Sequence, residues 1–399
     1  MNDIERFKSI LRFEKPDYVP IFAFPGAPGM SWGTVHEPIR QRLVEQGMPE
    51  WVGKYKCEKE GVYSYGQYLK NSAYESWMRY WGTTGPIWVA AYPFDAPVGL
   101  KYEKHYEDEF EIIEYETGAV TRQVVDNENI YIMPEFREFH VRDRKSWEYY
   151  RDRMTPGPIW SDEKIEKEYK KYSNRIRPLS IYLGSTYGNY RDLVGPYNAA
   201  VLMYDDPGLV HEIIEWENYN RKTYIYPLVR KLKPEILAMY EDCCYNNGML
   251  LSPKQLKEFC TPIYAEMNII AKENGVDMSV VDCDGNIREL VQPLEECGVN
   301  AMFPFEQKAG NDILKMRKEH PDFIIMGGLE KEVVNEGNDC LIRDEIMSKV
   351  PLMLEKGGYF PNGDHSIQPL VTFENLCKFF TLLHEVTGNP EGEFPRIKV

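Results

Sequence analysis

The sequence lacks the features that mark membrane, secreted or nucleic-acid-binding proteins. No apolar run approaches the roughly 20 residues of a transmembrane helix, and residues 1–6 are charged, unlike the start of a secretory signal peptide. Basic residues are scarce: 47 lysines and arginines face 63 aspartates and glutamates, which gives a net charge of −16. Nucleic-acid phosphates and anionic membranes both attract basic surfaces, so we expect neither as a partner.

Common catalytic signatures are also absent. The chain contains no GxGxxG, GxxxxGK[ST] or GxSxG motif, which argues against dinucleotide-dependent hydride transfer, ATP-dependent chemistry and serine hydrolysis. It contains no HExxH motif, and its eight cysteines form no CxxC pair. Scattered cysteines in apolar segments fit reduced thiols better than a disulfide scaffold. We therefore expect a cytoplasmic protein.

The second half of the chain alternates short apolar runs with longer amphipathic segments. This order predicts right-handed βαβ units and a parallel sheet. Two further strands near the N-terminus, Val19–Phe24 and Ile87–Tyr92, bring the count to eight, which favours an α/β fold of the closed (β/α)₈ TIM-barrel type. The other six expected strands are Leu179–Leu183, Ile236–Tyr240, Ser279–Asp282, Ala301–Phe305, Phe323–Gly327 and Gly358–Pro361.

The first half departs from this pattern in two places, although we expect residues 1–399 to form a single domain. Residues 30–100 form an N-terminal extension rich in tyrosine and tryptophan, whose rings either line a substrate pocket or pack irregular structure. Apolar surface in this region is compatible with a homodimer. Alternation of apolar and polar residues across 100–142 predicts antiparallel β-hairpins inserted into the barrel.

Ionisable residues follow five of the predicted strands. Catalytic groups of parallel barrels lie at the carboxyl ends of the strands, so these side chains should converge on one mouth. Like charges crowded together repel unless they are protonated or neutralised by a cation, which makes the cluster a functional candidate. Its members are Glu241, Asp242, Asp282, Asp284, Glu306, Glu330, Lys331, Asp364 and His365.

A metal ion is one solution to this crowding. The carboxylates of Asp282, Asp284 and Glu306 and the imidazole of His365 offer mixed oxygen and nitrogen ligands for zinc or a harder divalent ion.

Each group also has a purely structural interpretation. Asp284 would cap the following helix, Glu241-Asp242 would start one, and Asp364 and His365 would form a satisfied pair.

At these residues the chain resembles the uroporphyrinogen decarboxylase superfamily, which includes cobalamin-dependent methyltransferases. The resemblance runs from about Ser180 to Gly388 and implies a (β/α)₈ barrel. It is carried by Arg191-Asp192-Leu193-Val194-Gly195, Tyr204-Asp205-Asp206-Pro207, Glu241-Asp242, Leu251-Ser252-Pro253, Asp282-Cys283-Asp284-Gly285-Asn286, Pro304-Phe305-Glu306, Gly327-Gly328-Leu329-Glu330-Lys331, Gly363-Asp364-His365 and Phe373-Glu374-Asn375.

Two departures from the family pattern narrow the expected chemistry. Decarboxylase members carry an arginine-rich N-terminal motif that grips substrate carboxylates, whereas this chain has Phe24-Pro25-Gly26-Ala27-Pro28 there, so uroporphyrinogen is not the expected substrate. Methyltransferase members bind zinc through a His-x-Cys-Gly motif and a later cysteine. In that frame Asp282, Asp284 and His365 take the three ligand positions. An oxygen-rich site suits polarising a substrate oxygen rather than activating a thiol.

The resemblance implies a methyltransferase component of an O-demethylase system. Zinc would bind the oxygen of a small methoxylated donor, and a separate corrinoid protein carrying cobalamin would accept the methyl group. Glu241, Asp242 and Tyr240 are the expected catalytic residues, and the expected substrate-binding residues are Tyr187, Arg191 and Lys331.

Two alternatives stay open at this point. One is a metal-independent decarboxylase or lyase that uses Arg191 or Lys331 to hold the carboxylate of a small acid. The other is a barrel that binds a corrinoid or tetrapyrrole without turning it over.

Overall fold

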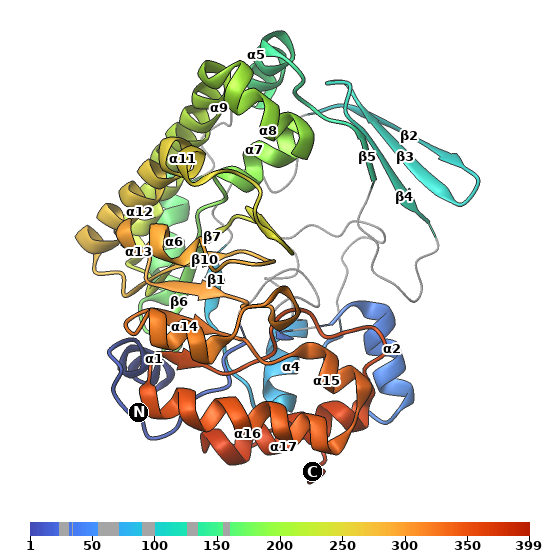
Figure 1. Cartoon of the computed structure of the whole chain (residues 1–399), viewed down its shortest axis with the longest axis vertical. Helices are drawn as coiled ribbons and strands as arrows, with labels where there is room; N and C mark the ends of the chain where they lie inside the picture. The colour runs from blue at the N-terminus through green and yellow to red at the C-terminus, as the bar shows by residue number, and fades with distance from the viewer. Residues whose placement is uncertain (24–31, 34, 55–71, 90–99, 126–134, 155–159) are drawn as a thin grey trace.

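The computed structural model describes residues 1–23, 32–33, 35–54, 72–89, 100–125, 135–154 and 160–399 (Figure 1). Seven parallel strands form a curled sheet of the TIM-barrel type, in the order β1-β6-β7-β10-β11-β12-β13. The strands follow one another across the sheet in the same order as in the sequence, as expected for successive right-handed βαβ units. The strands are β1 (Ile87–Val89), β6 (Leu179–Tyr182), β7 (Ile236–Tyr240), β10 (Met278–Asp282), β11 (Ala301–Phe303), β12 (Ile324–Met326) and β13 (Tyr359–Phe360).

The N-terminal segment lies between the two outer strands of this sheet. Around Ile21–Ala23 the chain runs parallel to Thr84, whose amide donates to Ile21 O over 3.0 Å and whose carbonyl accepts from the Ala23 amide over 2.7 Å. On the other side, Asn362 Nδ2 donates to Phe22 O over 3.3 Å, and the Phe22 and Phe360 rings lie 5.1 Å apart. The segment therefore takes the place of an eighth strand.

The predicted strands of the second half are confirmed, with small changes at their ends. The predicted run to Phe305 ends as a strand at Phe303, since Pro304 has no amide hydrogen to continue the ladder. Of the predicted Val19–Phe24 strand, Phe22 forms a parallel bridge. Residues 90–92 of the predicted Ile87–Tyr92 strand, and residue 24 of the first, lie outside the described residues.

Helices connect the strands and cover the outside of the sheet (Figure 1). The start of α11 follows from the local sequence: Ser252 and Gln255 form a capping box, with Pro253 at the first helical position. Within the described ranges, no helix is long and apolar enough to cross a membrane.

The main helices are α1 (Asp3–Leu11), α2 (Glu37–Glu45), α4 (Ser72–Trp81), α5 (Arg144–Met154), α6 (Asp162–Tyr172), α7 (Tyr187–Val194), α8 (Pro196–Asp205), α9 (Pro207–Asn220), α10 (Tyr226–Leu232), α11 (Pro253–Gln255), α12 (Thr261–Asn274), α13 (Val291–Glu296), α14 (Ile313–Glu319), α15 (Lys331–Glu336), α16 (Asp339–Lys356) and α17 (Phe373–Thr387).

The expected insertion is a four-stranded antiparallel sheet. It stands apart from the parallel sheet, beyond α8 in Figure 1. Its exposed outer strands carry charged side chains, which discourage pairing with other chains. The strands are β2 (Tyr102–Glu107), β3 (Phe110–Tyr115), β4 (Val120–Val124) and β5 (Glu135–Glu138).

Tryptophans of the aromatic-rich extension pack into the core. Trp32, Trp77 and Trp81 are almost fully buried, and the Trp81 ring stacks on Phe380 of α17 at a centroid distance of 4.9 Å. For these residues the packing interpretation holds. Tyr63, Tyr65 and Tyr68 lie outside the described residues.

We expect Phe22→Ala to destabilise the protein by about 3–5 kcal/mol, because it removes a buried ring at the closure between β13 and the N-terminal segment. Chemical unfolding followed by circular dichroism measures the change. The matched control is Phe136→Ala on the outer β5 strand, where the ring is 44% exposed and the effect should stay within about 0.5 kcal/mol. Equal losses in both variants would contradict this account of closure.

Candidate functional site

The sheet register brings three of the predicted acidic positions to one edge. In the parallel ladders, Tyr240 of β7 pairs with Asp282 of β10, and Asp282 pairs with Phe303 of β11. The residues that follow each strand therefore leave the sheet at the same level. This register places Asp242, Asp282 and Asp284 at the carboxyl ends of two neighbouring strands, the position of active sites in parallel barrels.

Asp242, Asp284 and His365 form a continuous chain of contacts. The Tyr240 hydroxyl donates to Asp242 Oδ2, and the Asp284 amide donates to Asp242 Oδ1 over 3.3 Å. His365 Nε2 lies 3.1 Å from Asp284 Oδ2. The side chains of Asp242, Asp284 and His365 keep 20%, 33% and 22% of their surface exposed, so the chain can be reached from solvent.

Asp282 is the member of the cluster without a partner. Its half-buried carboxylate receives no hydrogen bond from the described part of the chain. Burial raises its pKa well above the ordinary value, and the nearby charges of Asp284, Asp242 and Glu306 raise it further. Burial and then Asp284 also raise the pKa of Asp242. Without a bound cation, Asp242 and Asp282 therefore stay protonated to a higher pH than free aspartates do.

Glu306 and Lys331 pair with each other beside this cluster. Lys331 Nζ lies 2.8 Å from Glu306 Oε1, and the Gly285 amide donates to Glu306 Oε2 over 2.9 Å. Burial lowers the pKa of Lys331, but Asp364 and Glu306 more than offset it, and the net pKa is raised. The ammonium group is thus held charged by carboxylates of the protein itself.

Asp364 joins three strand-end loops, a role the sequence did not reveal. Its carboxylate accepts from the Gln307 amide over 2.7 Å and from the Lys331 amide over 2.9 Å. Burial raises its pKa to about 6. The structural interpretation in which Asp364 and His365 pair with each other is wrong, because the imidazole contacts Asp284 instead. Which oxygen a histidine faces depends on loop geometry that sequence spacing does not encode.

Glu241 points away from the cluster and binds the start of α7. Its carboxylate accepts from the amides of Thr186 and Tyr187, both over 2.8 Å, and from the Ser185 hydroxyl over 3.1 Å. Burial raises its pKa, and these hydrogen bonds oppose that rise. Glu241 is therefore engaged at a helix N-terminus, where a carboxylate satisfies free amides.

Arg191 and Tyr187 of α7 also have defined positions. Arg191 Nη1 donates to Asp242 O over 2.6 Å, and its other nitrogens bind Asp192 Oδ1 over 2.8 and 3.0 Å. Burial alone would lower the Arg191 pKa, but Asp192, Tyr240 and Asp242 raise it. Tyr187 is 1% exposed, so its ring supports the loop more than it faces solvent.

Backbone conformation at the mouth is unusual for residues with side chains. Asp242 has φ of 43° and Phe305 has φ of 61°, both in the left-handed region that non-glycine residues rarely adopt. Gly285 has φ of 80°, and a Cβ there would lie 2.9 Å from the Tyr245 backbone. Asp284 therefore sits in a tight loop and does not cap a helix, as one structural interpretation expected; α13 starts only at Val291.

Among the residues that the structure describes, only Cys243, Cys244 and Cys283 bring three potential ligand atoms within 4.8 Å of one another, so Asp282, Asp284 and His365 are not already gathered around one point. Asp284 and His365 are the two predicted ligands that lie close together, with an oxygen and a nitrogen 3.1 Å apart. That separation suits two ligands of one ion with bonds of about 2.0–2.2 Å. A cation would also remove the repulsion that keeps the carboxyl groups protonated. Glu306 is the less suitable predicted ligand, because Lys331 and Gly285 already bind both of its oxygens.

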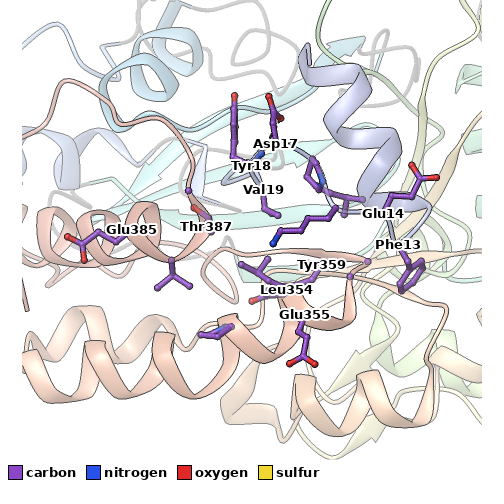
Figure 2. Close-up of a pocket in the computed structure, with 18 residues that line it drawn as sticks. Phe13, Glu14, Asp17, Tyr18, Val19, Leu354, Glu355, Tyr359, Glu385 and Thr387 are labelled. Atoms are coloured by element: carbon purple, nitrogen blue, oxygen red, sulfur yellow. Dashed lines mark hydrogen bonds between the residues drawn. The ribbon is translucent and has the colours of Figure 1, made fainter.

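A separate cavity of about 630 Å³ lies at the opposite end of the barrel. It is lined by residues that precede or begin β13, including Gly358 and Tyr359, and by Val19 and Leu354 (Figure 2). This is the amino-terminal face of the strands, where barrel enzymes carry structural rather than catalytic residues. The candidate site is therefore the acidic mouth.

We expect Glu241→Gln to lower the free energy of unfolding by about 2 kcal/mol or more. The side-chain NH₂ group of glutamine would face the Thr186 and Tyr187 amides, which donate to the carboxylate in the unchanged protein. Thermal and denaturant unfolding measure the loss. Glu319→Gln on the exposed face of α14 is the control and should change stability by less than about 0.5 kcal/mol. Full stability of Glu241→Gln would argue that Glu241 is not a structural anchor.

The His365 imidazole should titrate above its ordinary pKa in metal-free protein. Burial lowers this pKa, but the hydrogen bond and charge of Asp284 raise it more. His365 therefore stabilises the fold at low pH, and this contribution is lost as the pH rises through the folded-state pKa. In Asp284→Asn the pKa should fall, as measured by NMR titration of the histidine ring.

His140 provides an internal reference for that titration, because burial lowers its pKa to about 4 in a part of the molecule remote from the mouth. Its titration should be the same in both proteins. An unchanged His365 pKa in Asp284→Asn would contradict the pairing.

Comparisons with known proteins place this geometry in a family. A family model described as uroporphyrinogen decarboxylase (URO-D) matches residues 178–386, more than half of the chain and the part that carries the acidic mouth. No curated protein matches the sequence. Among solved structures, a methyltransferase from Methanosarcina mazei is similar in fold, with a TM-score of 0.53, 13% identity, and coverage of 93% of this chain and 95% of that one. The chain belongs to the uroporphyrinogen decarboxylase (URO-D) family.

Proposed function

We propose that this protein transfers a methyl group from the oxygen of a small methoxylated compound to a corrinoid carried by a separate protein, with the help of a bound zinc ion. The observation that supports the proposal is the pair of Asp284 Oδ2 and His365 Nε2, 3.1 Å apart at the carboxyl ends of the strands, with the unpartnered carboxylate of Asp282 two residues before Asp284. The fold shared with the Methanosarcina mazei methyltransferase is compatible with this function.

Asp282, Asp284 and His365 would hold the metal. Glu306 would lie next to these ligands without binding the metal itself. When bound, zinc supplies a Lewis acid that stabilises negative charge on the ether oxygen as the methyl group departs. Glu306 and Lys331 form an ion pair whose Gly285 contact fixes the loop bearing Asp284. Such outer contacts orient metal ligands and tune their basicity.

The electron balance defines what the protein must provide. The carbon–oxygen bond breaks with both electrons left on oxygen, and the reduced cobalt of the acceptor supplies the pair for the new carbon–cobalt bond. The acceptor is therefore oxidised by two electrons, and the donor leaves as an oxyanion. Asp242, whose pKa is raised by burial and Asp284 and whose carboxylate is held by Tyr240, would return a proton to that oxygen.

An exposed mouth suits a reaction between two proteins. Cobalt must approach the methyl carbon directly, so the acceptor protein has to dock over the carboxyl ends of the strands. Partial exposure of Asp284 and His365 leaves these groups open on that side. The net charge of −16 would favour a partner with a basic docking face.

Decarboxylation of a small acid receives less support from the geometry. That chemistry needs a cation directed at the substrate carboxylate, and Arg191 and Lys331 were the expected candidates. Lys331 is paired with Glu306, and Arg191 with Asp192. Each would have to leave an existing ion pair before it could bind substrate.

We expect zinc affinity to fall by more than about 100-fold in Asp282→Asn, Asp284→Asn and His365→Gln, since outer-shell changes alone cost about 10–100-fold. Competition titration with a chromophoric chelator measures the affinity. Asp344→Asn on the exposed part of α16 is the matched control and should bind zinc like the unchanged protein. Unchanged affinity in all three site variants would refute the ligand assignment.

The activity itself is tested with methoxylated aromatic compounds and reduced cobalamin as the methyl acceptor. Methylation of cobalt changes its visible spectrum, and the demethylated product is measured by chromatography. The same three variants should lose the reaction. Metal-independent release of carbon dioxide from small acids, without methyl transfer, would support the decarboxylase alternative instead.

A further inference from the structure

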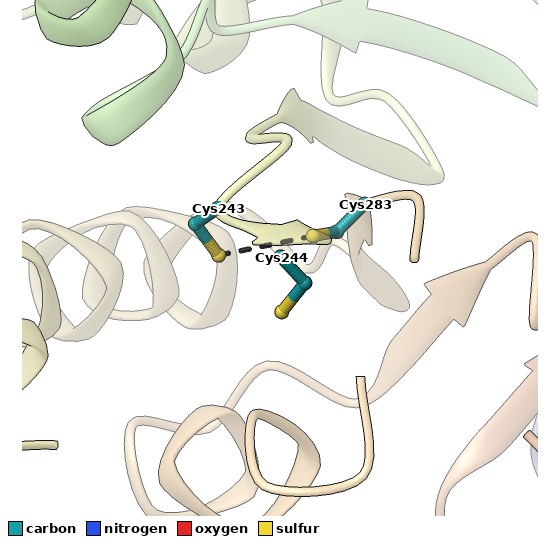
Figure 3. Close-up of side chains that lie close together, drawn as sticks. All are labelled: Cys243, Cys244 and Cys283. Atoms are coloured by element: carbon teal, nitrogen blue, oxygen red, sulfur yellow. Dashed lines mark hydrogen bonds between the residues drawn. The ribbon is translucent and has the colours of Figure 1, made fainter. Parts of the chain in front are cut away.

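Three cysteines lie together directly behind the acidic mouth. The side chains of Cys243, Cys244 and Cys283 lie close together (Figure 3). Cys243 and Cys244 follow Asp242 after β7, and Cys283 lies between Asp282 and Asp284 after β10. Their three sulfur atoms lie within 4.8 Å of one another, and Cys243 Sγ is 3.8 Å from Cys283 Sγ. All three side chains are buried, with exposures of 0%, 5% and 1%. We call this group the thiol cluster.

We propose that the thiol cluster binds a second metal ion, Zn²⁺, as a structural site distinct from the carboxylate site. Tetrahedral zinc with Zn–S bonds of about 2.3 Å holds its sulfur ligands about 3.8 Å apart. The separation of the Cys243 and Cys283 sulfurs matches this value. Sulfur ligands select zinc over magnesium or calcium, which prefer oxygen.

A buried tyrosine lies next to the cluster. The Tyr264 hydroxyl is fully buried and forms no well-aligned hydrogen bond among the residues that the structure describes, although the Cys260 thiol lies within reach of it. Burial raises its pKa, as do the neighbouring Glu241, Cys260, Cys243 and Cys283. A buried hydroxyl is stabilised by a hydrogen bond, and a metal-bound thiolate is a stronger hydrogen-bond acceptor than a neutral thiol.

Buried cysteines more often behave as small apolar side chains, and burial here raises the pKa values of Cys243 and Cys283. Thiols in this state are neutral. Metal binding would release their protons and replace them with one ion, as in other thiolate sites. Apolar packing explains the burial of the three residues, and the approach of three sulfur atoms within 4.8 Å of one another is the observation that favours a metal ion.

A metal ion at this position would tie two strand-end loops together. Cys243 and Cys244 belong to the loop that carries Asp242, and Cys283 belongs to the loop that carries Asp282 and Asp284. The cluster would therefore set the spacing of the carboxylates without touching the substrate. This role makes the three cysteines positioning residues and does not depend on which reaction the mouth performs.

Cobalt substitution distinguishes the two metal sites in the intact protein. Reduced, chelator-treated protein is titrated with Co²⁺, which gives an intense sulfur-to-cobalt charge-transfer band only when thiolates bind it. We expect the band in the unchanged protein and in Asp282→Asn, and its loss in Cys243→Ser and Cys283→Ser. Cys377→Ser, a buried cysteine on α17, is the control and should retain the band.

X-ray absorption of the zinc-loaded protein with the Asp282→Asn change keeps the test independent of how the cysteine variants fold. Three sulfur neighbours at about 2.3 Å would support the proposal. A zinc shell with oxygen and nitrogen only, or oxidation of Cys243 and Cys283 to a disulfide without zinc uptake, would overturn it. Failure of the methyl-transfer proposal leaves these outcomes unaffected, because they do not measure activity.

Discussion

Repulsion between carboxylates that lie side by side at the ends of β7 and β10 is the constraint on which the mouth depends. Tyr240 and the Asp284 amide hold Asp242, and His365 holds Asp284, but no described group holds Asp282. Buried like charges are expensive unless a proton or a cation compensates them. Hydrogen bonds in the surrounding loops hold these carboxylates close together. Asp364 binds two backbone amides from neighbouring loops, and Glu241 binds the amides at the start of α7.

Most of the fold could be predicted from the sequence, because apolar runs of strand length alternate with helical segments and each pattern has a direct physical cause. All six strands predicted after residue 178 appear. The sequence predicted Val19–Phe24 as a strand of a closed barrel, but not how this segment closes the sheet. Ile21–Ala23 joins it through a few main-chain bonds and the Asn362 side chain, and contacts between residues more than 300 positions apart leave no local pattern.

The site was predictable in its location but only partly in its roles. Residues after parallel strands must meet at one edge, so the convergence of Asp242, Asp282 and Asp284 followed from the strand assignments. Orientation did not follow. Glu241 and Asp242 are adjacent in sequence, yet one carboxylate binds the α7 amides and the other faces the mouth. The left-handed backbone at Asp242 accompanies that divergence, and composition gives no signal for it.

The sequence Asp282-Cys283-Asp284 has a consequence for how such a site could change during evolution. Successive residues at a strand end face opposite sides, so oxygen donors and a sulfur donor alternate within three positions. Inserting or deleting one residue in β10 would exchange them, presenting a soft sulfur to the mouth and hard oxygens to the interior. In this chain the kind of donor that faces the mouth therefore depends on the register of β10 as well as on which residues are present.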